Sequence, residues 1–383
     1  MATATRRSDL DWLRVGAIAL LVFFHSARVF DVNEAYYVQN RQLSPFLSYG
    51  VIGFFSRWGM ELLFLISGMA SCFALRGRSQ RDYLRDRWLR LGIPFVFGVL
   101  VLVPPQAYLA HVVNTPEPSG SYWSFLGGYF TDWSDLSGYR GTFTPGQLWF
   151  ILFLLAFSII GLPLFRWWSS PARAGVRDQV AGLFSARLAL LAWTVPLAVV
   201  TALPGVGGKN LLGYLLYFVL GYVLAATPSY QPAIDRDRHV YAVLGVVSWA
   251  AVTAAWVADV HVEAGSPGEL GFHVVRVLCT WTSVLALLGY AHTHLTSRPA
   301  WLGRANEAAF PVYLVHQTVL VAAADLLVRA SLGVTATYLL LVAATFAGSL
   351  LTYIGATQVA ALRVLFGLKT QVQAPAREGA AAV

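Results

Sequence analysis

Two ionisable residues enclose an apolar stretch near the amino terminus. Arg14 and His25 are separated by ten residues, VGAIALLVFF, none of which carries a charge. In an α-helix, which rises about 1.5 Å per residue, the His25 ring would lie about 16 Å along the axis from Arg14. Histidine is suited to proton transfer because its unperturbed pKa is about 6.5. The spacing therefore predicts a proton-transferring group deep within an apolar helix.

A carboxyl group and a second imidazole are expected at a similar depth. Glu61 lies in RWGMELLFLISG and His316 in FPVYLVHQTVLV, each roughly 15 Å from the start of its predicted helix. Charged side chains at a bilayer centre cost about 2.5–3.5 kcal/mol on insertion scales, so they are candidates for function. With His25 they could form a catalytic group in which a carboxylate stabilises a histidine that deprotonates a hydroxyl. The alternative is a hydrogen-bonded cluster that only holds helices together.

A cluster of arginines follows the second apolar stretch. Six arginines fall within RGRSQRDYLRDRWLR, residues 76–90, which is expected to be an inner loop. Guanidinium groups bind phosphates through paired hydrogen bonds, so the cluster is a candidate site for a polyphosphate ligand such as coenzyme A. Two other interpretations stay open: anionic lipid headgroups as the ligand, and a topology signal without a ligand. The residues predicted to bind the ligand are Arg14, Arg85, Arg87 and Arg90.

The elements that must position these side chains are membrane spans. Of the 383 residues, 57% are hydrophobic and 12% are charged, and the mean hydropathy is +0.60. Soluble domains carry about 25% charged residues, so this composition excludes an ordinary soluble fold. Because a span needs about 20 apolar residues, the sequence predicts an all-α, polytopic transmembrane helical bundle of about ten spans. The predicted spans lie near residues 10–30, 51–75, 91–112, 146–168, 187–204, 210–226, 239–259, 273–291, 307–329 and 336–366.

The distribution of basic residues predicts the orientation of the bundle. With the amino terminus in the cytoplasm, nineteen of the 27 lysines and arginines fall in cytoplasmic segments and four in outer segments. Such an excess marks the cytoplasmic side, so both termini are predicted to be cytoplasmic, in a bacterial inner or plasma membrane. We expect one transmembrane domain over residues 1–368 and a disordered cytoplasmic tail over residues 369–383. The net charge of +8 is explained by these segments, and nucleic acid is not expected as a partner.

The longest outer segment, residues 113–145, is rich in aromatic, glycine and acidic residues. Tyrosine and tryptophan favour the membrane interface, so one interpretation is an interfacial cap. The other is an aromatic surface on which sugar rings stack.

The sequence predicts neither a disulfide framework nor a metal site. Cys72 and Cys279 both fall within apolar runs and are expected to be small core residues. His292 and His294, in HTHL, have no obvious further ligands near them in the sequence.

Five motifs resemble, in order, those of the acyltransferase 3 family of multi-span membrane enzymes, and they cover residues 8–320. The glutamate at position 61 stands where that family usually has aspartate. Two shorter strings, RLGIP and HQTV, resemble the narrower glucans biosynthesis protein C-like branch. The five motifs are LDWLRVGAIALLVFFH, GMELLFLISGMAS, RDRWLRLGIP, GQLWFILFLL and YLVHQTVLV.

The resemblance implies transfer of an acyl group, of the acetyl or succinyl class, from cytoplasmic acyl-CoA to a hydroxyl. The acceptor would be a glycan, a lipid-linked sugar or a small molecule. His25 would be the catalytic base or the acyl acceptor, and Arg14 would mark the donor end of a protein-lined path. The resemblance also implies a role for the Arg-x-x-Arg pair Arg87 and Arg90. Direct transfer and a two-step route through an acyl-protein both stay open.

Two other classes of function compete with the enzyme. A secondary transporter or exporter of a polar or acylated metabolite would also use ionisable groups near the bilayer centre, although such proteins often show inverted repeats, which this sequence does not. A non-catalytic assembly partner would use the arginine cluster to bind anionic lipid. Transport predicts uptake without consumption of acyl-CoA, whereas the enzyme predicts CoA release that requires an acceptor.

Overall fold

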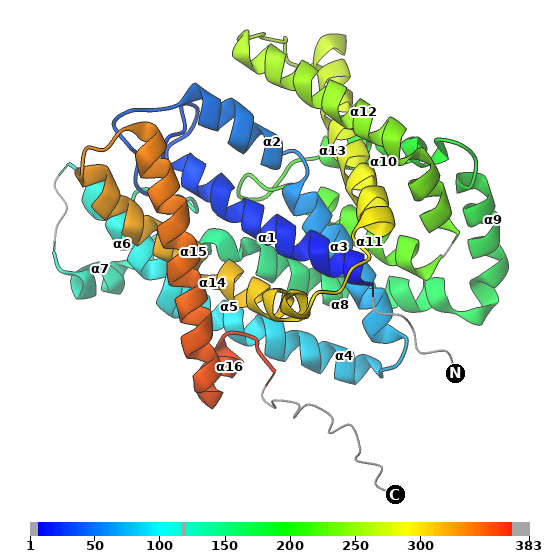
Figure 1. Ribbon diagram of the computed structural model, residues 1–383, viewed down its shortest axis with the longest axis horizontal. Helices are drawn as coiled ribbons and strands as arrows, with labels where there is room; N and C mark the ends of the chain where they lie inside the picture. Colours follow the sequence, from blue (N-terminus) through cyan, green and yellow to red (C-terminus); the bar gives the residue numbers. More distant parts are fainter. Residues whose placement is uncertain (1–6, 117–119, 228, 370–383) are drawn as a thin grey trace, which may run out of the picture.

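A computed structural model describes residues 7–116, 120–227 and 229–369, so the predicted tail falls almost wholly outside the described residues. Within these ranges every regular element is a helix, which confirms the all-α prediction (Figure 1). The α-helices are α1 (Ser8–Arg28), α2 (Gly53–Phe55), α3 (Gly59–Leu75), α4 (Gln80–Arg87), α5 (Ile93–Phe97), α6 (Val103–Asn114), α7 (Tyr122–Tyr129), α8 (Trp149–Ser169), α9 (Ala174–Phe184), α10 (Thr194–Thr201), α11 (Leu211–Ala226), α12 (Tyr230–Val257), α13 (Pro267–His294), α14 (Ala300–Arg329), α15 (Val334–Gln358) and α16 (Ala360–Leu365). Short 3-10 and π-helical segments are η1 (Phe46–Ile52), η2 (Trp88–Gly92), η3 (Gly98–Leu102), η4 (Gly146–Leu148), η5 (Pro171–Arg173) and η6 (Ala189–Trp193).

Eight helical segments of the described chain are long and apolar enough to cross a membrane. Two further apolar helices, Ala189–Thr201 and Leu211–Ala226, are shorter, and they correspond to the fifth and sixth predicted spans. The count of ten spans and the cytoplasmic placement of both termini therefore stay predictions. The eight long segments are Ser8–Arg28, Phe46–Leu75, Gln80–Asn114, Gly146–Ser169, Tyr230–Val257, Pro267–His294, Ala300–Arg329 and Val334–Gln358.

The long helices run between two ends of the bundle. The ring of Phe24, near the end of α1, lies 5.4 Å from the ring of Phe55, just before α3 begins. The far end of α3 carries Arg76, which donates to the Ala225 carbonyl oxygen of α11 at 2.7 Å. The start of α1, the end of α3 and α4 thus share one end, which we call the α4 end (toward the lower right of Figure 1). The opposite end carries the end of α1 and a large pocket, and we call it the pocket end.

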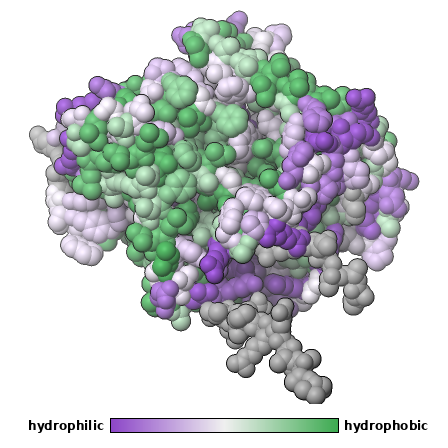
Figure 2. Space-filling model, viewed as in Figure 1, coloured by the Kyte–Doolittle hydropathy of each residue, from purple (hydrophilic) through white to green (hydrophobic). Residues whose placement is uncertain are grey.

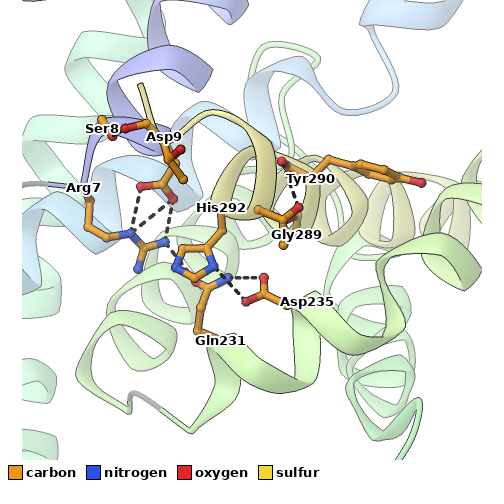
Figure 3. A network of polar contacts seen from close by, with 10 residues as sticks. Arg7, Ser8, Asp9, Gln231, Asp235, Gly289, Tyr290 and His292 are labelled. Atoms are coloured by element: carbon orange, nitrogen blue, oxygen red, sulfur yellow. Dashed lines mark hydrogen bonds and ion pairs between the residues drawn. The ribbon is translucent and has the colours of Figure 1, made fainter. Parts of the chain in front are cut away.

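A polar network holds the start of α1 at the α4 end (Figure 3). Arg7 donates to Asp9 at 2.7 Å and to the amide oxygen of Gln231 at 2.9 Å. Gln231 donates in turn to Asp235, which also accepts a hydrogen bond from His292 Nδ1 at 2.8 Å. The network links the amino terminus of α1 to α12 and α13, so it fixes the end of α1 opposite His25. The histidine pair of HTHL thus takes part in helix anchoring, through His292.

Helices α3 and α11 cross closely in the core. A Cβ at Gly68 would lie 1.9 Å from the Phe218 carbonyl oxygen, and a Cβ at Gly221 would lie 1.9 Å from the Leu65 carbonyl oxygen. Neither position has room for a side chain. Small residues of this kind let helix backbones approach closely in membranes, and here the contact holds α3 against the rest of the bundle.

The outer surface of the bundle is apolar over several long helices (Figure 2). An apolar surface of this extent is typical of contact with lipid rather than water. A polar strip follows the lower edge of the same view, where α4 and α16 lie. Exposed large apolar residues of α8, α12 and α15 include Ile159, Ile160, Val243, Val246, Val247, Leu339, Leu351 and Ile354.

Two predicted boundaries are wrong. The arginine-rich stretch is not a loop throughout, because Ser79 caps a helix by accepting from the backbone N–H of Asp82 at 3.2 Å. Helix α4 therefore begins at Gln80, and the third long segment starts there instead of at residue 91. The last predicted span ends early, because Val359 is extended and separates α15 from α16.

Candidate active site

A pocket of about 1070 Å³ lies at the pocket end of the bundle. Its wall is built from the end of α1, the loop that follows it, the segments before α3 and α8, the loop before α11, and parts of α12, α13 and α14. Polar and aromatic side chains converge from these separate parts of the chain, which is typical of a small-molecule site. The charged and hydrogen-bonding residues that matter below are His25, Arg28, Asp31, Glu34, Tyr36, Arg57, Lys209, Trp256, Arg276 and Gln317.

The His25 ring lines this pocket and touches a second imidazole. The ring centroids of His25 and His316 are 5.1 Å apart, so the two predicted histidines do meet. His316 itself is fully buried and is not part of the pocket wall. On its other side His25 faces Tyr36, whose hydroxyl lies 3.4 Å from His25 Nδ1. His25 is thus open to the pocket, with one polar partner and one imidazole beside it.

The protonation of His316 follows from its partner. Its Nδ1 lies 2.6 Å from the backbone carbonyl oxygen of Tyr313. A carbonyl oxygen only accepts, so Nδ1 carries a proton. That Nε2 is buried and has no hydrogen-bond partner within the described ranges. His316 is therefore a neutral imidazole fixed by its own helix.

Arg28 is the best-satisfied cation of the pocket. It forms an ion pair with Asp31 and another with Glu34 at 2.9 Å, and it donates to the Ala35 carbonyl oxygen at 3.1 Å. Both Arg28 and Asp31 are buried. A buried pair needs this many partners to offset its desolvation. The three contacts fix the loop after α1, which carries Tyr36 to the side of His25.

Three other cations of the pocket have no carboxylate in direct contact within the described part of the chain. The Arg57 guanidinium stacks on the Trp256 ring at 4.0 Å, and its buried Nη2 has no hydrogen-bond partner there. Lys209 Nζ lies 5.3 Å from the centre of the Trp149 ring. Burial lowers the pKa of Lys209, against the opposing effect of the Glu34 charge. Arg276 lines the same pocket from α13.

Glu61 lies away from the two histidines. Glu61 does not line the pocket. In the described part of the chain, the hydrogen-bond partners of His25 and His316 are Tyr36 and the Tyr313 carbonyl, and Glu61 bonds to neither histidine. The charges that act on it are those of Arg57 and Arg276. One of its carboxylate oxygens, Oε2, is buried without a hydrogen-bond partner in the described part of the chain. The three predicted catalytic residues therefore form a pair of histidines and a separate carboxylate.

The four arginines predicted to bind the donor all lie toward the α4 end. Arg14 donates to the Asn306 amide oxygen at 3.0 Å. Arg87 donates to the Ser71 hydroxyl at 3.0 Å, and Arg90 contacts Asp86 at 2.9 Å. Arg85 is exposed at the surface of α4. These side chains thus line one edge of the bundle, at the opposite end of α1 from His25.

Sequence reasoning missed several residues of the pocket. Arg28, Arg57 and Arg276 carry a visible signal, because each is a charged residue in or beside an apolar span, and such residues mark functional sites. Asp31 and Tyr36 carry none, because they stand in an irregular loop whose path depends on the ion pairs of Arg28. The missed residues supply most of the charge of the site.

The predicted outer segment reaches the pocket through Tyr139. Its ring lies 5.0 Å from the Tyr37 ring, and it lines the cavity. Farther out, Trp123 and Trp133 are exposed. The segment therefore contributes both a pocket wall and an exposed aromatic surface.

No group of three or more histidine, cysteine, aspartate or glutamate side chains suited to a metal ion occurs among the residues that the structure describes. Cys72 and Cys279 are both free and buried in that part of the chain.

The sequence matches the acyltransferase domain family over residues 7–354. Among similar proteins are three named glucans biosynthesis protein C, from Salmonella paratyphi A, Salmonella agona (strain SL483) and Salmonella typhi. Each is 21% identical over 334 residues, with 82% of this chain and 82% of the relative covered. No solved structure matches the chain.

Proposed function

This chain belongs to the acyltransferase 3 family, and from that premise we propose its donor, its acceptor and its catalytic base. The family match and the apolar helices make it a membrane acyltransferase. The proposed donor is acyl-CoA, the transferred group is of the acetyl or succinyl class, and the acceptor is a hydroxyl of a glycan, a lipid-linked sugar or a small molecule. The proposed base is His25.

One observation carries the proposal: His25 lies on the wall of a large pocket that is also lined by charged side chains, and its ring is open to that pocket. An imidazole facing lipid could not meet a hydrophilic hydroxyl. The name of the relatives, glucans biosynthesis protein C, supports a glycan as the acceptor. Tyr139 and the exposed aromatic residues of the same segment offer rings on which a sugar can stack.

The chemistry needs one proton transfer. In the proposed tautomer the proton of His25 lies on Nδ1, which faces the Tyr36 hydroxyl at 3.4 Å, and the Nε2 lone pair accepts the proton of the acceptor hydroxyl. The acceptor oxygen then attacks the thioester carbonyl, the carbon–sulfur bond breaks, and the protonated imidazole returns its proton to the departing thiolate. General base catalysis of this kind contributes about 10²–10⁴-fold, and alignment of the two substrates supplies the rest. A route in which His25 itself carries the acyl group uses the same pocket.

His316 and Glu61 have different proposed roles. His316 packs beside His25 and is itself fixed by its own helix, so it orients the catalytic ring. Glu61 acts at a second place, as the counter-charge of Arg57 and Arg276. We therefore assign Glu61 to substrate binding and not to the proton transfer.

The donor is proposed to bind at the α4 end, where the coenzyme A phosphates meet Arg14, Arg85, Arg87 and Arg90. Helix α1 connects that end to His25, and the acyl group must travel along it for about 16 Å. This arrangement requires an even number of spans, for which we propose ten, with both termini and the α4 end in the cytoplasm and the pocket facing the other side of the membrane. The excess of basic residues at the α4 end supports that orientation.

The test compares cells that produce the wild-type protein, His25→Ala, or His261→Ala as a control. His261 is an exposed loop histidine outside the pocket. Mass spectrometry of surface glycans and lipids should show an acetyl or succinyl increment with the wild type and the control but not with His25→Ala. An unchanged increment with His25→Ala, at equal protein levels, contradicts the assignment of the base. Uptake of a metabolite down its gradient without acyl-CoA consumption would instead support the transporter.

A further inference from the structure

A second, smaller cavity of about 210 Å³ lies between α12, α13 and the segment before α3. Its wall is almost entirely apolar and aromatic. Arg57 belongs to the walls of both cavities, so the small cavity adjoins the large one at this guanidinium. We call the smaller cavity the groove. Its lining residues are Phe54, Arg57, Trp58, Ala242, Gly245, Val246, Trp249, Cys279, Ser283, Ala286, Leu287 and Tyr290.

Arg57 is buried, but its hydrogen-bonding capacity is only partly used. Arg57 is only 7% exposed, and its Nη2 atom has no hydrogen-bond partner within the described ranges. The Trp256 ring covers one face of the guanidinium at 4.0 Å. A buried donor without a partner costs free energy, and more when it is charged. A ligand acceptor at the junction of the two cavities would satisfy it.

The charges at this junction also favour an anion. Arg57 and Arg276 act on each other as like charges, and Glu61 is the carboxylate that acts on both. Yet within the described part of the chain Glu61 forms no ion pair with either arginine at 4 Å or less. Two guanidinium groups facing one pocket repel each other unless an anion lies between them. Planar guanidinium groups match the paired oxygens of a phosphate.

The groove lies where a lipid would meet the protein. Val246 belongs to its wall and is 63% exposed, and the exposed Val243 and Val247 flank it on α12. Tryptophan side chains mark the membrane interface, and Trp58, Trp249 and Trp256 surround the junction at Arg57. The junction opens into the pocket that holds the proposed catalytic base, because Arg57 and His25 both line it. A lipid phosphate at Arg57 would thus place its headgroup in the large pocket.

We propose that Arg57 and Arg276 hold the phosphate of a membrane lipid whose chain lies in the groove between α12 and α13 and whose headgroup enters the large pocket. This inference rests on the proposed function in one respect. If His25 acts on a hydroxyl in the large pocket, that hydroxyl belongs to a lipid-anchored headgroup. The lipid site itself does not depend on catalysis.

The test uses the whole protein in nanodiscs that contain equal parts of phosphatidylglycerol and phosphatidylcholine. Native mass spectrometry counts the copies of each lipid that stay bound after release from the disc. The wild type should retain phosphatidylglycerol over phosphatidylcholine by about tenfold, because both lipids offer the same phosphate but the quaternary ammonium of phosphatidylcholine adds a positive charge that the two guanidinium groups repel. Arg57→Gln and Arg276→Gln should lose this preference.

Two matched pairs of variants separate the phosphate site from the groove. Val246→Trp fills the groove from an exposed position, whereas Val247→Trp adds the same side chain at a neighbouring exposed position outside it. Arg140→Gln removes an exposed arginine outside both cavities and controls for net charge. Loss of the preference with Val246→Trp, and its retention with Val247→Trp and Arg140→Gln, is the expected result.

Three results overturn the proposal. If the wild type shows no preference, there is no anionic lipid site. If Arg57→Gln loses the preference and Val246→Trp keeps it, the lipid phosphate binds at Arg57 but its chain does not lie in the groove. If the control variants also lose it, the attraction is a general surface effect. His25→Ala should keep wild-type lipid retention, so an active His25→Ala would refute the catalytic base without touching the lipid site.

Discussion

Arg28 and Arg57 line the same pocket but are held in opposite ways. Arg28 lies between two carboxylates and a backbone carbonyl, all supplied by the loop that follows α1. Arg57 is equally buried, yet its described partners are an aromatic face and the more distant charge of Glu61. On the Arg28 side of the pocket, carboxylates of the protein neutralise the buried cation. On the Arg57 side, no carboxylate of the described chain forms an ion pair with the buried cation.

The difference indicates a structural role for Arg28 and a ligand-binding role for Arg57. A cation that the protein itself neutralises holds a loop in place, and here the loop brings Tyr36 to His25. A cation left without a hydrogen-bond acceptor costs stability, which is reasonable only where a ligand supplies the missing acceptor. Functional sites commonly show such local conflicts with folding rules. Four predictions test whether the two sides of the pocket differ in this way.

The largest effect is expected from Arg28→Ala. The change leaves Asp31 buried without its cation, and breaking a buried ion pair in this way costs about 3–5 kcal/mol. The thermal unfolding midpoint in detergent should fall strongly, and acyl transfer should fall with it because the loop is released. A thiol-reactive dye can follow unfolding, since Cys72 and Cys279 are buried.

Glu34→Ala is the matched control for Arg28→Ala. Glu34 also pairs with Arg28, but its side chain is 71% exposed. Exposed ion pairs contribute about 0–1 kcal/mol, so the midpoint should change little. Equal losses in the two variants would show that burial of the Arg28 and Asp31 pair does not stabilise the loop.

Arg57→Gln should weaken acceptor binding without lowering the stability of the protein. Without this charge the repulsion from Arg276 disappears, so the unfolding midpoint should stay unchanged or rise. The KM for the acceptor should rise by about ten- to a hundredfold, since hydrogen bonds to charged groups contribute about 1.5–3 kcal/mol. Steady-state kinetics and unfolding of the same preparation measure both. A lower midpoint with an unchanged KM would make Arg57 a structural residue like Arg28.

The sequence predicts the apolar helices and the two buried histidines better than it predicts the place of Glu61 or the path of the loop after α1. The helical class, the first span and the fourth span follow from apolar runs, because lipid contact and helix length impose a strong pattern. The apolar runs predict His25 and His316 at a similar depth, where contact is possible, and their rings lie 5.1 Å apart. Histidines in apolar runs are rare enough to stand out.

The carboxylate partner could not be predicted in the same way. Equal depth in a membrane fixes the height of a side chain but not the direction in which it points, so Glu61 was expected beside His25 and lies with Arg57 and Arg276 instead. The loop after α1 has no periodic pattern at all. Its path is set by contacts of Arg28 with residues three to seven positions later, which only the folded chain reveals.

Tyr36→Phe tests how the Arg28 side of the pocket serves catalysis. The hydroxyl lies 3.4 Å from His25 Nδ1 and is the polar partner of that ring in the described structure. Loss of one neutral hydrogen bond corresponds to about 0.5–1.5 kcal/mol, so kcat should fall about two- to tenfold with little change in KM or stability. A kcat loss as large as that of His25→Ala would instead mean that the hydroxyl takes part in the reaction directly.

The smallest effect concerns Lys209, which lines the same pocket and is half-buried beside Trp149. Burial holds the pKa of this side chain below its ordinary value of 10.5 in the folded protein, and the Glu34 charge opposes that shift. Between the two values the unfolded chain binds more protons than the folded one, so Lys209 makes the free energy of unfolding rise with pH in that window. Lys209→Met lacks this contribution. Its unfolding midpoint relative to the wild type should therefore be highest near neutral pH and should decline as the pH approaches 10.5. A difference between the two proteins that is constant from neutral to alkaline pH would show that Lys209 keeps its full charge and hydration in the pocket.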